Sequence, residues 1–211
     1  MTAQVIFARP AGAVTPAEWT TRLRNGATTR TRLATIGDLP SVNALHTRSS
    51  RRSLTLRYLT GRQCLSAAEW RALTAPSAGL TWVTHPAGDP GRVIAVTHVL
   101  HTDRTPGFHP ARGADHGPAE LALLIDDAWQ ARGLGSVLAR RAVAIARQRG
   151  HNELHALVLS ENRPALALAR VLGAVVTTQG TQCTVRLSLT RQDEAAPRRS
   201  PPTDAGVPGD G

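Results

Sequence analysis

The stretch ELALLIDDAWQARGLGSVLARRAVAIARQRG, residues 120–150, decides the fold of this chain. Its first six residues, Glu120–Ile125, form an apolar run with the length of a buried strand. From Leu134 onward, apolar residues recur at helical spacing until Gly150, and glycine commonly follows the end of a helix. The stretch therefore predicts a strand, a turn that contains glycine, and a helix in direct succession. Asp126 and Asp127 are interpreted as formers of the turn.

The turn between this strand and this helix has the composition of an anion-binding loop. Gly133 and Gly135 carry no Cβ, so the backbone can approach a ligand closely at both positions. The first amides of a helix have no partner within it, and the helix dipole favours negative charge at that end. Arg132 adds a side-chain cation. The turn therefore predicts a pyrophosphate as its ligand.

Two other phosphate-binding patterns do not fit the same glycines. A dinucleotide fingerprint requires G-x-G-x-x-G/A, but Leu138 stands three residues after Gly135. A P-loop requires a lysine, and the chain contains none. A glycine turn that serves chain geometry alone stays open, although it does not account for a second block of sequence, Ser160–Ala174.

Two segments of the chain resemble the GNAT acyltransferase superfamily. Gln130–Gly135 has the form Q-x-x-G-x-G of that family's acyl-CoA-binding motif, and Asn162–Ala174 is similar to its N-x-x-A-x-x-L-x-x-x-L-G segment. The resemblance covers roughly residues 28–190 and is densest over 120–174. It implies an α/β protein with the GNAT fold, a mixed twisted sheet of six to seven strands. Helices cover both faces of that sheet, and its central parallel strands splay apart.

The N-terminal half adds a weaker resemblance that concerns the substrate. Leu45-His46 and the pattern S-x-x-S-x-x-x-R-Y in Ser50–Tyr58 resemble the N-terminal helices of bacterial Pat-type protein acetyltransferases. Arg51 and Arg52 stand where proline and glutamate are usual in that pattern. The resemblance slightly favours a protein lysine over a small amine as the acceptor.

The family resemblance implies acetyl-CoA as the co-substrate, with no metal. It implies backbone hydrogen bonds to the pantetheine or the acyl carbonyl from Leu123, Leu124 and Ile125. It also implies that Asn162 meets the cofactor from the helix that follows. The residues that would hold the diphosphate form one continuous segment: Gln130, Ala131, Arg132, Gly133, Leu134, Gly135 and Ser136.

Glu120 is the expected general base. It begins the cofactor strand, where many family members carry a catalytic glutamate, and a carboxylate at the edge of an apolar cleft suits proton transfer from an ammonium substrate. A solvated residue at the start of a strand is the alternative. Ala169 occupies the position where many members have a tyrosine as general acid, and the chain's only tyrosine is Tyr58. A small-amine N-acetyltransferase and a non-catalytic acyl-CoA-binding sensor therefore stay open as alternative functions.

Composition limits the remaining classes of function. All 25 basic residues are arginine and the formal net charge is +10, but the arginines are scattered with little aromatic interleaving, which disfavours nucleic acid. No apolar run is long enough to span a membrane, and the N-terminus lacks a secretory pattern, so a cytoplasmic protein is expected. A homodimer stays open. The histidines around the loop before Glu120 fit no metal-binding spacing: His98, His101, His109 and His116.

The chain divides into an N-terminal extension, residues 1–27, an acyltransferase domain, residues 28–190, and a tail, residues 191–211, with the composition of a disordered segment. Within the extension, Thr15–Trp19 has the pattern of a helix start, because Pro16 suits a first helical turn. Strands are also expected at 28–35, 80–85, 92–101, 153–159, 174–178 and 182–189. Helices are also expected from residue 39, where Asp38 would cap, and at 50–58, 66–73 and 162–172.

Overall fold

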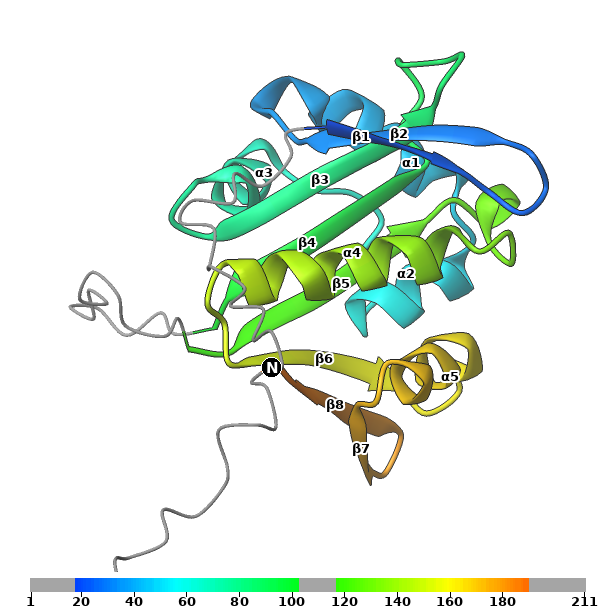
Figure 1. Cartoon of the computed structure of the whole chain (residues 1–211). Coiled ribbons are helices and arrows are strands. Elements are labelled where there is room, and N and C mark those ends of the chain that lie inside the picture. The colour runs from blue at the N-terminus through cyan, green and yellow to red at the C-terminus, as the bar shows by residue number, and fades with distance from the viewer. Residues whose placement is uncertain (1–17, 103–116, 190–211) are drawn as a thin grey trace, which may run out of the picture.

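The computed structural model describes residues 18–102 and 117–189 (Figure 1). Within these residues eight strands form one sheet in the order β1-β2-β3-β4-β5-β6-β8-β7. The strands are β1 Glu18–Arg22, β2 Thr28–Leu33, β3 Gly79–Pro86, β4 Ala95–His101, β5 Ala119–Ile125, β6 Glu153–Leu159, β7 Val175–Gln179 and β8 Gln182–Ser188. The α-helices are α1 Leu39–Arg48, α2 Arg51–Tyr58, α3 Ala67–Thr74, α4 Leu134–Gln148 and α5 Arg163–Val171, with short 3-10 turns η1 Ile36–Asp38 and η2 Asp127–Trp129.

The central pair of strands, β5 and β6, separates the sheet into two halves. These two strands run parallel, whereas the other neighbouring pairs are antiparallel. Their pairing is confined to Ala119 with Leu154 and Glu120 with His155, and beyond Glu120 the strands diverge. The mixed sheet with splayed central strands and helices on both faces is thus confirmed, with eight strands in the described residues instead of six or seven. Glu120 lies at the apex of the splay.

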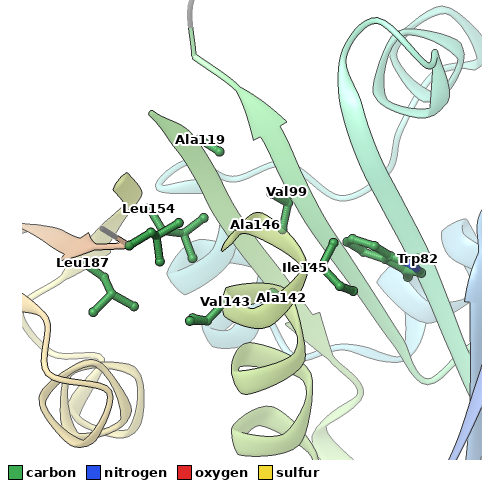
Figure 2. Close-up of a cluster of buried hydrophobic side chains, with 10 residues drawn as sticks. Trp82, Val99, Ala119, Ala142, Val143, Ile145, Ala146, Leu154 and Leu187 are labelled. Carbon is green, nitrogen blue, oxygen red and sulfur yellow. The ribbon is translucent and has the colours of Figure 1, made fainter. Parts of the chain in front are cut away.

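Helices cover the two faces of the sheet differently, with α4 on one face and α1, α2 and α3 on the other (Figure 1). Alternation along the strands sorts the side chains between these layers. On β3, Trp82 packs beneath α4 together with Ile145, whereas Val83 packs beneath α1 together with Leu45. Figure 2 shows the α4 layer, in which Ala142, Val143, Ile145 and Ala146 meet Trp82, Val99 and Leu154. This layer fixes the helix whose first turn belongs to the site.

The N-terminal region differs from the expectation at two points. Glu18–Arg22 pairs with β2 as an edge strand, although its first residues were expected to belong to a helix start. Trp19 explains the difference, because its ring packs edge-on against Trp82 at 6.1 Å between centroids, a contact between distant parts of the sequence. Asp38 precedes α1 as expected, but its carboxylate accepts from the Thr35 amide at 2.7 Å and from Arg32, not from the helix.

Candidate active site

A cavity of about 460 Å³ lies where β5 and β6 diverge. Its lining is mainly apolar, and the charged side chains within it are Arg57 and Glu120. The larger groups of lining residues come from four elements: Leu56–Leu59 at the end of α2, Glu120–Leu123 of β5, Leu154–Val158 of β6, and Asn162, Ala165, Leu168, Ala169 and Leu172 at and within α5. An apolar cleft with a few convergent polar groups is the usual form of a ligand site.

Glu120 lines this cavity at the last paired position of the β5–β6 ladder. Strand alternation directs its side chain to the same face as Leu124, which packs beneath α1 and α2. The side chain is exposed to solvent, so the desolvated carboxylate that the sequence predicted is not present in this structure. Glu120 therefore meets the requirement of position for a base.

The backbone of β5 beyond Glu120 is unpaired on the side that faces β6. The Asp126 amide donates to Ile94 on the β4 side at 2.9 Å, so alternation directs the polar groups of Leu124 toward β4 as well and those of Leu123 and Ile125 toward the gap. The Ile125 carbonyl already accepts from Gln130 at 3.0 Å. Leu123 therefore offers the free backbone groups that the resemblance requires, whereas the predicted contact through Leu124 is not available.

The turn before α4 has the backbone geometry of an anion-binding site. Gly133 occupies the N-cap with φ at 86°, a left-handed conformation that favours glycine. Because glycine has no side chain, no side-chain group of this residue caps the helix. The first three amides of this 15-residue helix, those of Leu134, Gly135 and Ser136, have no helical partner by geometry. A Cβ on Gly133 would contact nothing within 4 Å, so the approach to these amides is open.

Gly135 has a different reason for being glycine than the sequence indicated. A Cβ built there would lie 3.3 Å from Ile125 Cδ1 and 4.0 Å from Leu123 Cδ2. The missing side chain therefore allows α4 to pack closely on β5. Arg132 stays available as a surface cation, with its guanidinium carbon 5.3 Å from the centre of the Trp129 ring. Ala131, with φ at 56°, completes the left-handed turn.

Gln130 links the turn to the start of α2. Its Nε2 lies 3.0 Å from Ser53 Oγ and 2.9 Å from Asp127 Oδ1. Asp127 in turn accepts from the Ser53 hydroxyl and from the Ser50 amide at 2.8 Å. Partial burial raises the pKa of Asp127, but the hydrogen bonds from Ser53 and Ser50 outweigh it and lower the pKa below its ordinary value. The two serines of S-x-x-S-x-x-x-R-Y therefore attach α2 to the turn before α4.

Replacement of Asp127 by alanine tests this connection. Because the carboxylate accepts hydrogen bonds from the N-terminal turn of α2, Asp127→Ala is expected to lower the free energy of unfolding by about 1 kcal/mol. The acceptor KM should rise several-fold, because α2 carries residues of the cavity wall. Urea unfolding and steady-state kinetics measure the two effects. Asp89→Ala, at an exposed position after β3, is the matched control, and equal behaviour of the two variants would contradict the positioning role.

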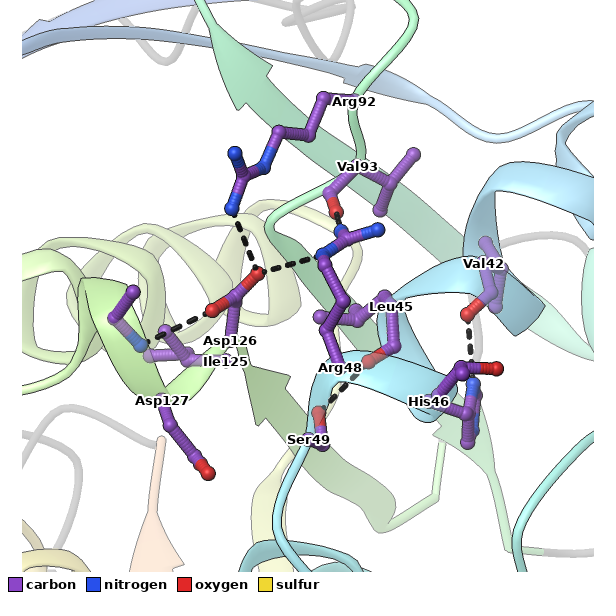
Figure 3. A network of polar contacts seen from close by, with 12 residues as sticks. Val42, Leu45, His46, Arg48, Ser49, Arg92, Val93, Ile125, Asp126 and Asp127 are labelled. Carbon is purple, nitrogen blue, oxygen red and sulfur yellow. Dashed lines mark hydrogen bonds and ion pairs between the residues drawn. The ribbon is translucent and has the colours of Figure 1, made fainter.

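Asp126 joins the end of α1, the segment before β4 and the turn in a polar network (Figure 3). Its Oδ2 lies 3.1 Å from Arg48 Nε and 3.5 Å from an Arg92 nitrogen, and its Oδ1 accepts from the Ala128 amide at 3.0 Å. Arg48 also donates to the Val93 carbonyl at 2.7 Å. Asp126 is therefore a turn former, as predicted from the sequence, with a second role in holding the end of α1 against this turn.

Asn162 and Ala169 bring α5 into the cavity wall. Asn162 is the N-cap of the helix, and its side-chain oxygen accepts from the Ala165 amide at 3.3 Å. This leaves its side-chain NH₂ group as the donor that can meet a ligand. Ala169 is buried at 7% exposure and supplies no proton. The absence of a tyrosine here therefore widens the apolar part of the cavity.

Tyr58 also lines the cavity, but its hydroxyl proton is directed away from it. Nδ1 of His46 lies 2.7 Å from the Val42 carbonyl and therefore carries the hydrogen, while burial lowers the His46 pKa and keeps the ring neutral (Figure 3). Nε2 of His46 must then accept from the Tyr58 hydroxyl at 2.6 Å. Burial also raises the Tyr58 pKa. Tyr58 is therefore poorly suited to protonate a leaving group.

The histidines near the loop do not form a metal centre in the described residues. His98 is buried beneath α2, with Nδ1 2.9 Å from Thr81 Oγ1, and burial together with nearby Arg57 lowers its pKa well below the ordinary value. His109 and His116 lie outside the described residues. No group of three or more metal-ligating side chains occurs in 18–102 and 117–189. In the same ranges, no helix has both the length and the apolar character of a membrane span.

Sequence comparison identifies the class of proteins to which this architecture corresponds. A model of the acetyltransferase (GNAT) family matches residues 50–174, which include α2, the β5–α4 turn and α5. A mycothiol acetyltransferase from Clavibacter sepedonicus is 43% identical over 68 residues, 32% of this chain. This chain spans only 22% of the length of that relative.

Structural comparison agrees with the family match. The GNAT domain of S. lividans PAT superposes with a TM-score of 0.69 and 25% identity, covering 81% of this chain and 96% of that domain. The yncA protein from Salmonella typhimurium, solved with its cofactor acetyl-CoA, superposes with a TM-score of 0.59 and 18% identity, covering 82% and 99% of the two chains. The second likeness concerns the fold alone.

Proposed function

Because the chain belongs to the acetyltransferase (GNAT) family, we propose that it transfers an acetyl group from acetyl-CoA to a primary amine. The observation that carries this proposal is the cavity between the diverging strands β5 and β6, with Glu120 at the point where they separate. The turn of Gly133 follows β5 in the sequence. The donors suit the cofactor, because helix amides and Arg132 match a diphosphate and the unpaired edge of β5 matches an amide-containing pantetheine arm.

In this proposal, the residues of the chain prepare the amine and exclude water from it. Bound acetyl-CoA supplies the thioester, whose C–S bond breaks as the amine nitrogen forms a bond to the carbonyl carbon. Glu120 accepts, directly or through one water, the proton that the ammonium group must lose before it attacks, and the nitrogen loses its second proton to solvent as the amide forms. The thiolate that leaves takes its proton from solvent, because Ala169 has no acidic hydrogen and the Tyr58 hydroxyl donates to His46. The apolar lining limits the access of competing water.

The acceptor remains either a protein lysine or a small amine. The pattern in Ser50–Tyr58 slightly favoured lysine, but Ser50 and Ser53 have positioning roles that any acceptor would require. A sensor that binds acyl-CoA without turnover is the second candidate, and the observation that favours it is the absence of a general acid at Ala169. The Glu120 variant described in the Discussion separates the enzyme from the sensor.

Calorimetry with acetyl-CoA, followed by mass spectrometry of acetylated products, tests the proposal. Saturable binding and acetylation of at least one amine in a panel of lysine peptides and small amines are expected. Product detection by mass is preferred to thiol reagents, because Cys64 is an exposed free cysteine. Gly133→Ala should weaken acetyl-CoA binding about 5- to 30-fold, because a Cβ at a left-handed residue costs about 1–2 kcal/mol. No heat of binding in correctly folded protein would refute the proposal.

A further inference from the structure

The cavity wall contains a cation, Arg57, that forms no ion pair with the described residues. Its Nε is buried and has no hydrogen-bond partner in this part of the chain. Its contact with the Tyr58 ring, at 4.7 Å from the guanidinium carbon to the ring centre, satisfies no N–H donor. A buried charge without a hydrogen-bonded partner is costly, so such groups are commonly paired with a ligand when they line a cavity.

The surroundings of Arg57 do not neutralise it. Burial, together with the charge of Arg57, lowers the pKa of His98 and of His46, so both rings are neutral and neither adds charge beside Arg57. Arg62, nearby on the chain, adds positive charge and is paired with Glu69. Glu120 is the remaining carboxylate that acts on Arg57, and it does so from a distance beyond that of an ion pair. The cavity therefore has a cation on its α2 wall and a carboxylate at the apex of the splay.

We propose that Arg57 binds an anionic group of the acceptor, so that the natural substrate is a small primary amine that also carries a carboxylate or phosphate. This inference rests on the proposed function and adds the class of acceptor to it. The ammonium group of such a molecule faces Glu120, and its anion forms charge-assisted hydrogen bonds with the guanidinium of Arg57, which lines the same cavity. A lysine side chain has no anion of its own near the nitrogen, so it leaves Arg57 without a partner.

Matched pairs of acceptors test this subsite in the unmodified protein. β-Alanine and 4-aminobutyrate are compared with ethylamine and propylamine, which have the same carbon chains without the carboxylate, and 2-aminoethyl phosphate tests the phosphate. At least one amine that carries a carboxylate or phosphate should exceed its partner without that group by 30-fold or more in kcat/KM. Equal rates within each pair, or faster acetylation of a lysine peptide than of every anionic amine, would overturn the inference while leaving the proposed function intact.

Variants of Arg57 distinguish binding of an anion from a structural role. Arg57→Gln should raise KM at least 10-fold for the preferred amine that carries a carboxylate or phosphate. It should change kcat/KM less than threefold for the partner amine that lacks this group. Arg57→Lys should restore part of the preference, because it keeps the charge. Arg52→Gln, at an exposed position of the same helix, is the control. An equal loss with both members of a pair would assign Arg57 to packing only. Unchanged binding of acetyl-CoA, measured by calorimetry, shows that the cofactor site is intact in each variant.

Discussion

Glu120→Gln is expected to lower kcat at pH 7 by about 10²- to 10⁴-fold, the usual contribution of a general base. Glutamine has the size of glutamate and can keep the backbone pairing of Glu120 with His155, so the apex of the splay should persist. Affinity for acetyl-CoA should stay within about twofold, because the turn of Gly133, which we propose as the binding site of the diphosphate, is on another segment. Steady-state kinetics and calorimetry on the same preparation provide both numbers.

The pH dependence of this variant identifies the reason for the loss. A base is required only while the acceptor is protonated, and an amine with a pKa near 10 loses its proton spontaneously as the pH approaches that value. The deficit of Glu120→Gln should therefore shrink as the pH rises from 7 toward 10. A variant that keeps at least a third of wild-type turnover at pH 7 would exclude Glu120 as the base.

The same experiment separates the enzyme from the sensor. If the wild-type protein binds acetyl-CoA but acetylates no amine, Glu120→Gln has no turnover to lose, and the absence of an acidic group at Ala169 becomes the physical reason. If turnover is present, a large loss in the variant identifies a catalytic carboxylate. Binding alone cannot distinguish these functions, because the turn before α4 serves both.

The sequence predicted the elements whose determinants are local. The apolar run of β5, the glycine turn and the periodicity of α4 each lie within one short segment. β1 was wrongly predicted to begin with a helix because its stability depends on pairing with β2 and on the contact of Trp19 with Trp82, neither of which is encoded nearby. Long-range contacts of this kind leave no periodic signal.

The residues of the candidate site also divide into those with a local sequence signal and those whose role depends on distant contacts. Gly133 and Asn162 could be proposed from motifs, whereas the solvent exposure of Glu120 depends on how two strands diverge. Gln130 matched a ligand-binding motif, but it bonds to Ser53, a residue from a different helix. Arg57 belonged to a recognised pattern without a role, because only the folded chain reveals that its Nε is buried and has no hydrogen-bond partner among the described residues.

Trp82→Ala is expected to lower the free energy of unfolding by about 3–5 kcal/mol, because the change leaves a large cavity in the layer beneath α4. Trp82 is 1% exposed and packs in one cluster with Val99, Ala142 and Ile145 (Figure 2). Its ring also supports Trp19, so the loss should extend to the edge strand β1. Urea unfolding followed by tryptophan fluorescence measures the change.

Trp82→Phe provides the control that assigns this loss to packing. The Nε1 of Trp82 is buried without a hydrogen-bond partner among the described residues, so removal of this N–H eliminates an unsatisfied donor and offsets part of the lost ring area. Trp82→Phe should therefore cost clearly less than Trp82→Ala. Because Trp82 does not line the cavity at the splay, the folded fraction of both variants should keep its affinity for acetyl-CoA. Equal losses of stability in the two variants would instead mean that the indole N–H, through an interaction such as a bound water, stabilises this layer as much as the ring does.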